Sequence, residues 1–299
     1  MIDVVNVTKR FGKFTALSGL SFSVSRSSIY GLVGYNGAGK TTLLKTIAGV
    51  YKPEEGEVRI DGEPIFENAK MKQRLFYVPD DLYFQPYASM EKMACFYQGY
   101  YPKFSDKTFQ SLAKVFKLDV TKRINGFSKG MQRQAEMVLG MSAHPDVLLL
   151  DESFDGLDPA KRSLTKQLLA EYMAEKEVAI VVSSHNLHEV EDLCDHVGLI
   201  NGQKLAMDCS IAQISQSRCK FRLAFGREMT QQDFPGLAIK RFQRDGSMIL
   251  LTAAGEKEQV EAQLRGMNPL VLEAMPLSLE EIFLDEMEGT DYDFSEIFR

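Results

Sequence analysis

Residues 34–41 have the composition of a loop that wraps around phosphate groups. They run Gly-Tyr-Asn-Gly-Ala-Gly-Lys-Thr and fit the pattern G-x-x-x-x-G-K-[ST]. Glycines allow backbone N–H groups to curl around a polyphosphate, and a helix that starts there adds positive potential. In this pattern Lys40 reaches the terminal phosphates and the Thr41 hydroxyl can ligate Mg²⁺. The nucleotide-binding residues that we predict here are Gly34, Asn36, Gly37, Ala38, Gly39, Lys40, Thr41 and Thr42.

A pair of adjacent carboxylates, Asp151 and Glu152, follows the apolar run at residues 147–150. Phosphoryl transfer needs one acid in the Mg²⁺ shell and another group that activates or orients the attacking water. We assign the first role to Asp151 and the second to Glu152. Without the glycine loop, the same pair would also be compatible with a solvated strand end.

The residues around these two segments alternate between strand and helix patterns. Residues 29–33 form a short apolar run that leads into the glycine loop, and apolar residues recur at helical spacing after it. Residues 147–150 and 178–182 are continuous apolar runs, as expected of parallel strands that are covered on both faces. These patterns predict an α/β body with the glycine loop between a buried strand and a helix.

Size and composition narrow the class of protein. The chain has 299 residues, 44% hydrophobic and 25% charged, which suits one large or two modest globular domains. A net charge of −6 argues against a generally basic nucleic-acid-binding protein. The four cysteines form no C-x-x-C pair, so we expect free thiols. We find no secretory signal and no apolar run near the roughly 20 residues of a membrane-spanning helix, so we expect a membrane role only through a partner chain.

Three further motifs follow in the order of a known family. Residues 127–132, Phe-Ser-Lys-Gly-Met-Gln, resemble the signature LSGGQ, residues 154–158, Phe-Asp-Gly-Leu-Asp, match a D-loop, and His185 follows the apolar run at 178–182. With the two segments above, they make residues 1–210 similar to ATP-binding cassette (ABC) nucleotide-binding subunits. Phe11-Gly12 resembles the A-loop of the same family.

The resemblance implies a role for each of these motifs. Ser128 and Gly130 would bind the γ-phosphate of ATP held by another subunit, with a helix N-terminus facing the anion. His185 would contact the γ-phosphate as a switch histidine, so Glu152 and His185 are the expected catalytic residues. Phe11 would stack on adenine. Three of these residues also have a purely structural interpretation. Ser128 would be a helix N-cap, His185 a structural residue and Phe11 part of the core.

The resemblance also implies a fold and domain organisation. We expect a P-loop ABC cassette over residues 1–210, with a RecA-like α/β core, an antiparallel β edge and a helical subdomain at about 83–142. Residues 211–299 change to short alternating strands and polar helices, which predicts a small C-terminal α+β domain. That domain is either regulatory or dimer-stabilising, or a passive appendage.

The function that follows is ATP hydrolysis with Mg²⁺ that energises a separate polytopic membrane permease, in the direction of export. The expected partners are that permease and a second ATP-binding subunit, in a homodimer or heterodimer that ATP closes, and no nucleic acid. The expected location is cytoplasmic, on the inner face of the cell membrane through the permease. Two alternatives stay open: a soluble ATP-driven switch acting on ribosomes or DNA, and an ATP-dependent scaffold that does not hydrolyse.

The sequence departs from the family pattern at two places. Asp80 takes the position of the family's Mg²⁺-sensing glutamine after residues 76–78, and it is the third metal ligand that we expect beside Thr41 and Asp151. In the signature, Lys129 replaces a glycine and Met131 the glutamine. With these two departures, both the rate of ATP hydrolysis and the coupling of hydrolysis to transport stay open.

Two other segments carry predictions of their own: an aromatic-rich segment at residues 83–104 and the segment from residue 278 onward. Eight aromatic residues fall within 83–104, where the family docks its permease, and we expect about half of them to fill the core. Residues 278–281, Ser-Leu-Glu-Glu, form a capping box, and residues 278–284 resemble the ending of single-cassette exporter subunits. The segment from Glu280 to the last residue contains eight acidic residues and one arginine, and this composition predicts a solvated tail.

Overall fold

The computed structural model describes residues 1–213 and 218–287. The chain divides into two compact units, Met1–Asp208 and Cys209–Arg299, and each is described here by itself. Among the described residues, no helix combines the length and the apolar character needed to cross a membrane.

The first unit is built on a six-stranded sheet that places the predicted site residues at one edge. Neighbouring strands β3, β8, β7 and β6 run parallel, as do β3 and β9. Every residue of β7 and β8 is buried, as the apolar runs predict for strands covered on both faces. In sheet order the strands are β10 (Lys204–Ser210), β9 (His196–Asn201), β3 (Ser28–Val33), β8 (Ala179–Ser184), β7 (Val147–Asp151) and β6 (Leu75–Val78).

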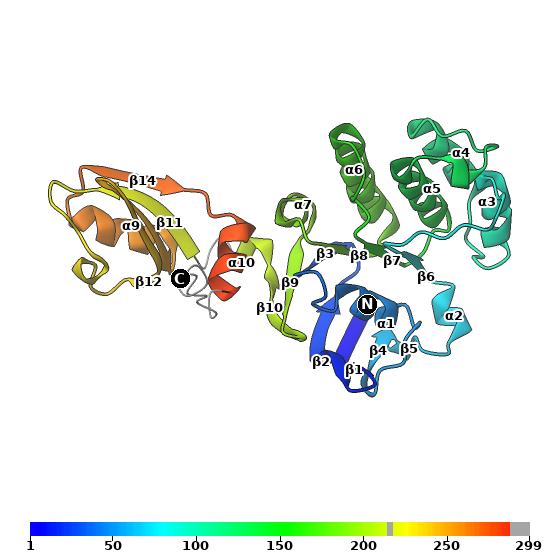
Figure 1. Ribbon diagram of the computed structural model, residues 1–299, viewed down its shortest axis with the longest axis horizontal. Coiled ribbons are helices and arrows are strands. Elements are labelled where there is room, and N and C mark those ends of the chain that lie inside the picture. The colour runs from blue at the N-terminus through cyan, green and yellow to red at the C-terminus, as the bar shows by residue number, and fades with distance from the viewer. Residues whose placement is uncertain (214–217, 288–299) are drawn as a thin grey trace, which may run out of the picture. The chain divides into compact units, whose positions relative to one another are not determined.

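A second, antiparallel sheet packs against the first through helix α1 (Lys40–Ile47). Leu43, Leu44 and Ile47 of α1 are fully buried in one core with residues of both sheets. Figure 1 shows α1 beside the strands of this second sheet. Its order is β2 (Phe14–Val24), β1 (Ile2–Phe11), β4 (Glu55–Ile60) and β5 (Glu63–Pro64).

Three helices gather beyond the edge strand β6 and form the helical subdomain (Figure 1). They are α3 (Met90–Gln98), α4 (Asp106–Val115) and α5 (Lys129–Ser142), and each begins at a serine N-cap: Ser89, Ser105 and Ser128. The short 3₁₀ turn Ile124–Gly126 precedes α5. The other helices of this unit are α2 (Ala69–Lys72), α6 (Pro159–Lys176) and α7 (Leu187–Leu193).

The second unit is a four-stranded antiparallel sheet with one buried face. Phe221, Leu223 and Leu251 of that face pack with Val260 and Leu264 of α9. The capping box is confirmed, because Glu281 N–H donates to Ser278 Oγ and Ser278 N–H donates to Glu281 Oε2. In sheet order the strands are β12 (Ala238–Asp245), β13 (Met248–Ala254), β11 (Arg218–Ala224) and β14 (Val271–Met275). The helices of this unit include η2 (Gln231–Asp233), α9 (Lys257–Gly266) and α10 (Leu279–Met287).

The sequence patterns miss four of the described strands, the two-residue β5 and the longer β9, β10 and β12. In β10 and β12 exposed or half-buried positions prevail, so neither strand has the apolar run that marks a buried one. In β9, Gly198 interrupts the apolar residues, which leaves no continuous apolar run. The predicted acidic tail continues into residues 288–299, which lie outside the described part of the chain.

Candidate nucleotide-binding and catalytic site

The glycine loop joins β3 to α1 and takes a conformation that its glycines permit. Gly37 and Gly39 have φ angles of 83° and 111°, which side-chain-bearing residues rarely adopt. A Cβ atom on Gly39 would lie 2.8 Å from the Ala16 carbonyl oxygen, so the loop sits directly on β2. Asn36 is exposed, Ala38 and Thr42 are half-buried, and Ala38 N–H donates to the Tyr35 carbonyl. The predicted binding residues of this loop therefore lie together around the start of α1.

The Lys40 ammonium is buried beneath this loop, with 5% of the residue exposed. It donates to the Gly34 carbonyl oxygen at 2.7 Å and lies 3.2 Å from Oε1 of Glu152. A phosphate that reaches Lys40 has to compete with these two acceptors. The arrangement holds the cation at the position where a polyphosphate curled in the loop would end.

Asp151 is the most enclosed acid of the site. Its Oδ1 accepts from Thr41 Oγ1 at 3.2 Å and from Ser183 Oγ at 2.7 Å, and its Oδ2 accepts from the Tyr77 hydroxyl at 2.9 Å. The residue is fully buried. Burial, together with the Asp151 charge, raises the pKa of Tyr77 well above its ordinary value, so this phenol stays a donor at neutral pH. Three hydroxyls thus fix the carboxylate next to Thr41.

The oxygens of Thr41 and Asp151 have the spacing of two ligands of one magnesium ion. Adjacent ligands of an octahedral Mg²⁺ with bonds of about 2.1 Å lie about 3 Å apart. Thr41 Oγ1 and Asp151 Oδ1 are 3.2 Å apart, and both are hard oxygen donors. These two residues fit the metal predicted for them.

Glu152 and His185 form a second polar pair at the same sheet edge. His185 Nδ1 lies 2.9 Å from Oε2 of Glu152, and the His185 N–H donates to the same oxygen. Glu152 has a φ of 46°, and its N–H donates to Ser183 Oγ. Asp155 places a carboxylate oxygen within 4.8 Å of the ligand atoms of this pair. An unusual backbone conformation held by such bonds is a feature of functional sites.

Phe11 lies at the end of β1, with 44% of the residue exposed. Its ring packs edge-on against Tyr51, with 5.3 Å between the ring centroids, and Lys9 Nζ lies 5.3 Å from the Phe11 centroid. It is therefore a surface ring and not a core phenylalanine. An exposed aromatic face of this kind is available to stack on a base.

Ser128 and Gly130 begin α5 and meet the D-loop. Ser128 Oγ accepts from the Met131 N–H, so the residue is an N-cap, and the residue itself is exposed. A Cβ on Gly130 would lie 2.7 Å from the Gly156 carbonyl oxygen. Both residues line, with Leu157 and Asp158, one pocket of about 340 Å³. Asp158 caps α6, where its Oδ1 accepts from the Lys161 N–H.

Asp80 is the predicted metal ligand that the structure pairs with a different group. Its Oδ1 accepts from Arg133 Nη2 at 2.9 Å. The sequence analysis did not single out Arg133, Tyr77 or Ser183. Tyr77 and Ser183 lie in the strands on either side of β7, which carries Asp151. The apolar runs at residues 76–78 and 178–182 mark these strands, but only the structure shows that both of them neighbour β7. Nothing in the spacing of Arg133 indicates its partner.

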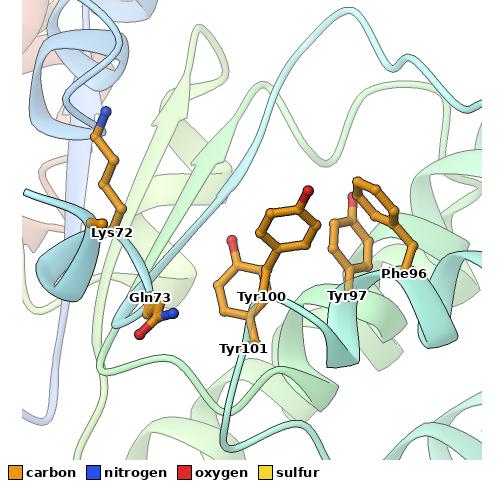
Figure 2. Close-up of a pocket in the computed structure, with 7 residues that line it drawn as sticks. Lys72, Gln73, Phe96, Tyr97, Tyr100 and Tyr101 are labelled. Atoms are coloured by element: carbon orange, nitrogen blue, oxygen red, sulfur yellow. The ribbon is translucent and has the colours of Figure 1, made fainter. Parts of the chain in front are cut away.

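An aromatic groove lies in the same unit, between α2 and α3. The eight aromatic residues divide evenly: Tyr83, Tyr87, Phe96 and Tyr100 are exposed, and Phe84, Tyr97, Tyr101 and Phe104 are buried or half-buried. Figure 2 shows the rings of Phe96, Tyr97, Tyr100 and Tyr101 on one side, with Lys72 and Gln73 on the other. They line a cavity of about 370 Å³.

Sequence comparison places these residues among known proteins. A family model described as ABC transporter matches residues 17–155. The chain is 27% identical to the ABC transporter ATP-binding protein YtrB of Bacillus subtilis (strain 168), over 97% of this chain and 99% of that protein. It is 32% identical to the Nod factor export ATP-binding protein I of Burkholderia lata, with 95% of each chain covered.

Solved structures share the fold of the first unit. An ATP-binding subunit of an ABC transporter matches with a TM-score of 0.67 and 24% identity, covering 72% of this chain and 91% of that chain. The ATP-binding cassette MJ0796, solved as a dimer in a post-hydrolysis state with ADP and Pi, matches with a TM-score of 0.65 and 20% identity, covering 71% and 99%. At these identities the likeness shows the fold.

Proposed function

The chain belongs to the ATP-binding subunits of ABC transporters, and we propose that it binds ATP with Mg²⁺ in the glycine loop, hydrolyses it, and so drives a separate export permease. The family and cassette fold predicted from the sequence are thereby confirmed. The observation that carries the proposal is the convergence of Lys40, Thr41, Asp151, Glu152 and His185 at one sheet edge.

In this proposal the loop and α1 hold the triphosphate. Backbone N–H groups of residues 34–42 surround the phosphates, and Lys40 exchanges the Gly34 carbonyl and Glu152 for phosphate oxygens. Thr41 and Asp151 hold the Mg²⁺. Bound there, the ion would neutralise charge that develops on the phosphate oxygens. Phe11 stacks on the adenine ring from the end of β1.

Hydrolysis then depends on Glu152 and His185. Glu152 accepts a proton from water as the water oxygen attacks the γ-phosphorus and the bond to the bridging oxygen of ADP breaks. His185 holds Glu152 Oε2 through Nδ1 and the backbone N–H, which leaves Nε2 for the γ-phosphate. In this role both ring nitrogens carry a proton, so that Nδ1–H donates to Glu152 and orients the base while Nε2–H donates to a γ-phosphate oxygen.

A second ATP-binding subunit completes the site. Ser128 and Gly130 lie at the N-terminus of a 14-residue helix, whose free amides and positive potential suit an anion. We propose that they meet the γ-phosphate held by the glycine loop of the other subunit, in a homodimer or a heterodimer. Separation after hydrolysis moves the attached permease.

We propose that the permease docks in the aromatic groove. Its four rings and the side chain of Lys72 offer an apolar surface with a cationic rim, which suits an amphipathic helix with an acidic residue at its edge. Through this contact the protein would sit on the inner face of the membrane.

The proposed function is tested with Glu152→Gln and Ser128→Arg. We expect Glu152→Gln to bind ATP, to lose turnover, and to form dimers in ATP and Mg²⁺ by sedimentation. Adding Ser128→Arg should leave ATP binding by the monomer intact and remove the dimer. Turnover in Glu152→Gln at the wild-type rate, or no ATP binding by wild type in calorimetry, contradicts the proposal.

The permease contact is tested separately by crosslinking. A cysteine replaces Tyr100, an exposed residue that lines the groove, in a Cys95→Ser background, since Cys95 is an exposed thiol in the neighbouring helix α3. We expect crosslinks to a polytopic membrane protein, and the same cysteine at the exposed Glu175 of α6 serves as the control. Crosslinks from Glu175→Cys alone would reject the groove as the docking surface.

A further inference from the structure

One buried side chain joins the helical subdomain to the loop that follows β6. Arg133 of α5 has 8% of the residue exposed. Its Nη1 donates to the Pro79 carbonyl oxygen at 3.0 Å, and its Nη2 donates to Asp80 Oδ1 at 2.9 Å. A guanidinium fork that makes two bonds to neighbouring residues fixes orientation as well as distance. The loop and the helix are therefore held in one relative position.

The pair is costly to separate. The Arg133 side chain is 10% exposed, while that of Asp80 is 57% exposed and supplies the negative charge. Loss of the carboxylate would leave a buried cation with one neutral acceptor, the Pro79 carbonyl. Removal of Asp80 would leave this largely desolvated guanidinium without its counter-ion, although the exposure of Asp80 makes the pair weaker than a fully buried one. Displacement of the loop is therefore expected to move the helix with it.

The strand that leads into this loop, β6, is bonded to the metal side of the nucleotide site. Tyr77, three residues before Asp80, donates from β6 to Asp151, the acid that also accepts from Thr41. β6 is a short edge strand paired with β7, so a shift at Asp151 acts directly on the end of β6.

At its other end, the connection reaches the signature segment. Arg133 lies five residues after Ser128 in the same helix, and α5 continues without a break to Ser142. Gly130 packs on the Gly156 backbone. Because a helix moves as a rigid element, the position of Arg133 sets the direction in which Ser128 faces.

We propose that Arg133 is a positioning residue that, through Asp80, ties the N-terminus of α5 to the nucleotide site of its own subunit. Asp80 serves this link rather than the metal. Binding at Thr41 and Asp151 would then set how Ser128 is presented to the second subunit. The inference rests on the proposed ATP-dependent dimer and deepens it.

The test is a double-mutant cycle in the Glu152→Gln background, where ATP is not consumed. The variants are Asp80→Ala, Arg133→Met and both together, with Asp80→Asn as the conservative variant and the exposed Asp81→Ala as the matched control. Sedimentation in ATP and Mg²⁺ gives the dimer dissociation constant. Calorimetry with Ser128→Arg added gives the ATP affinity of the monomer.

We expect each single variant to weaken the dimer by about tenfold or more, within the usual range of coupling between sites, with monomer ATP affinity unchanged. The dimer of the double variant should be no weaker than the dimers of the single variants, because each single substitution already removes the same link. Asp80→Asn should weaken the dimer less, since its amide oxygen still accepts from Arg133. Asp81→Ala should have the same dimer dissociation constant as the Glu152→Gln parent.

Three results overturn the inference: additive effects in the double variant, unchanged dimers, or a loss of ATP affinity as large as the loss of dimer. Should Arg133→Met fail to fold, the dimers of Asp80→Ala and Asp80→Asn are compared instead. Asp80 is largely exposed, and this comparison also tests whether the link to Arg133 supports the dimer. If the Glu152→Gln parent itself forms no dimer with ATP, the proposed function fails, and this inference with it.

Discussion

The Lys40 ammonium and the Glu152 carboxylate lie 3.2 Å apart at the end of the glycine loop, both largely buried. In the proposed function, Lys40 binds phosphate and Glu152 activates water. The ion pair means that each restrains the other, and a bound γ-phosphate has to enter between them.

Replacement of Glu152 by Gln is therefore expected to affect turnover and ATP affinity differently. Turnover should fall by about 10²- to 10⁴-fold, as for loss of a general base. ATP affinity should stay level or rise, because Lys40 no longer has a carboxylate competitor. Calorimetry and phosphate release measure the two effects. A fall in ATP affinity would show that Glu152 supports binding instead.

Replacement of His185 by Ala should lower kcat while ATP affinity is retained. The imidazole contacts Glu152 Oε2 at 2.9 Å, so its loss frees the base to reorient. We expect a fall of about 10²-fold. His188→Ala, three residues on in α7 and also exposed, is the matched control. Equal effects of the two variants would remove the catalytic role of His185.

Replacement of Thr41 by Val should raise the Mg²⁺ concentration needed for turnover. The hydroxyl that lies 3.2 Å from Asp151 is lost, while the shape of the side chain is kept. We expect a shift of about tenfold, and Thr41→Ser should restore the wild-type requirement. Titration of Mg²⁺ after chelation measures it. An unchanged requirement would exclude Thr41 as a ligand.

Replacement of Gly130 by Ala should destabilise the contact between the signature and the D-loop. The new Cβ would lie 2.7 Å from the Gly156 carbonyl oxygen, so one of the two segments has to move. We expect a loss of about 1–3 kcal/mol in the free energy of unfolding. At Gly126 a Cβ would meet no atom within 4 Å, so Gly126→Ala is the control. Chemical denaturation compares them.

Replacement of Glu136 by Gln should flatten the dependence of stability on pH. Burial raises the pKa of Glu136 from its ordinary 4.5 to about 7, although the Tyr97 hydroxyl donates to its Oε1 at 3.1 Å. The folded chain then binds this proton more tightly than the unfolded chain. Its contribution is complete below pH 4.5 and is lost as the pH rises through 7.

The size of that effect is on the order of 2–3 kcal/mol between pH 5 and pH 8. Gln resembles the protonated acid, so the variant should be the more stable protein at pH 8 and should differ little at pH 5. Denaturation at both values measures the difference. A wild-type protein that gains stability over this range relative to the variant would contradict the prediction.

Much of the site could be predicted because its chemistry lies in short, contiguous segments. The loop at residues 34–41 carries its own glycines, cation and hydroxyl, and strand ends bring Asp151 and His185 to the same sheet edge. Alternating and apolar runs identified β3, β7 and β8 for the same reason. Strands with mixed burial, such as β12, have no such local mark.

What the sequence determined by itself was the family, the nucleotide and the order of the motifs, since these follow from residues that are neighbours along the chain. The tertiary structure decided which distant residues hold them. Tyr77 reaches Asp151 across 74 positions and Arg133 reaches Asp80 across 53. Such pairs depend on how helices and strands pack. A hydrogen bond is set by distance in space, and spacing along the chain leaves that distance open.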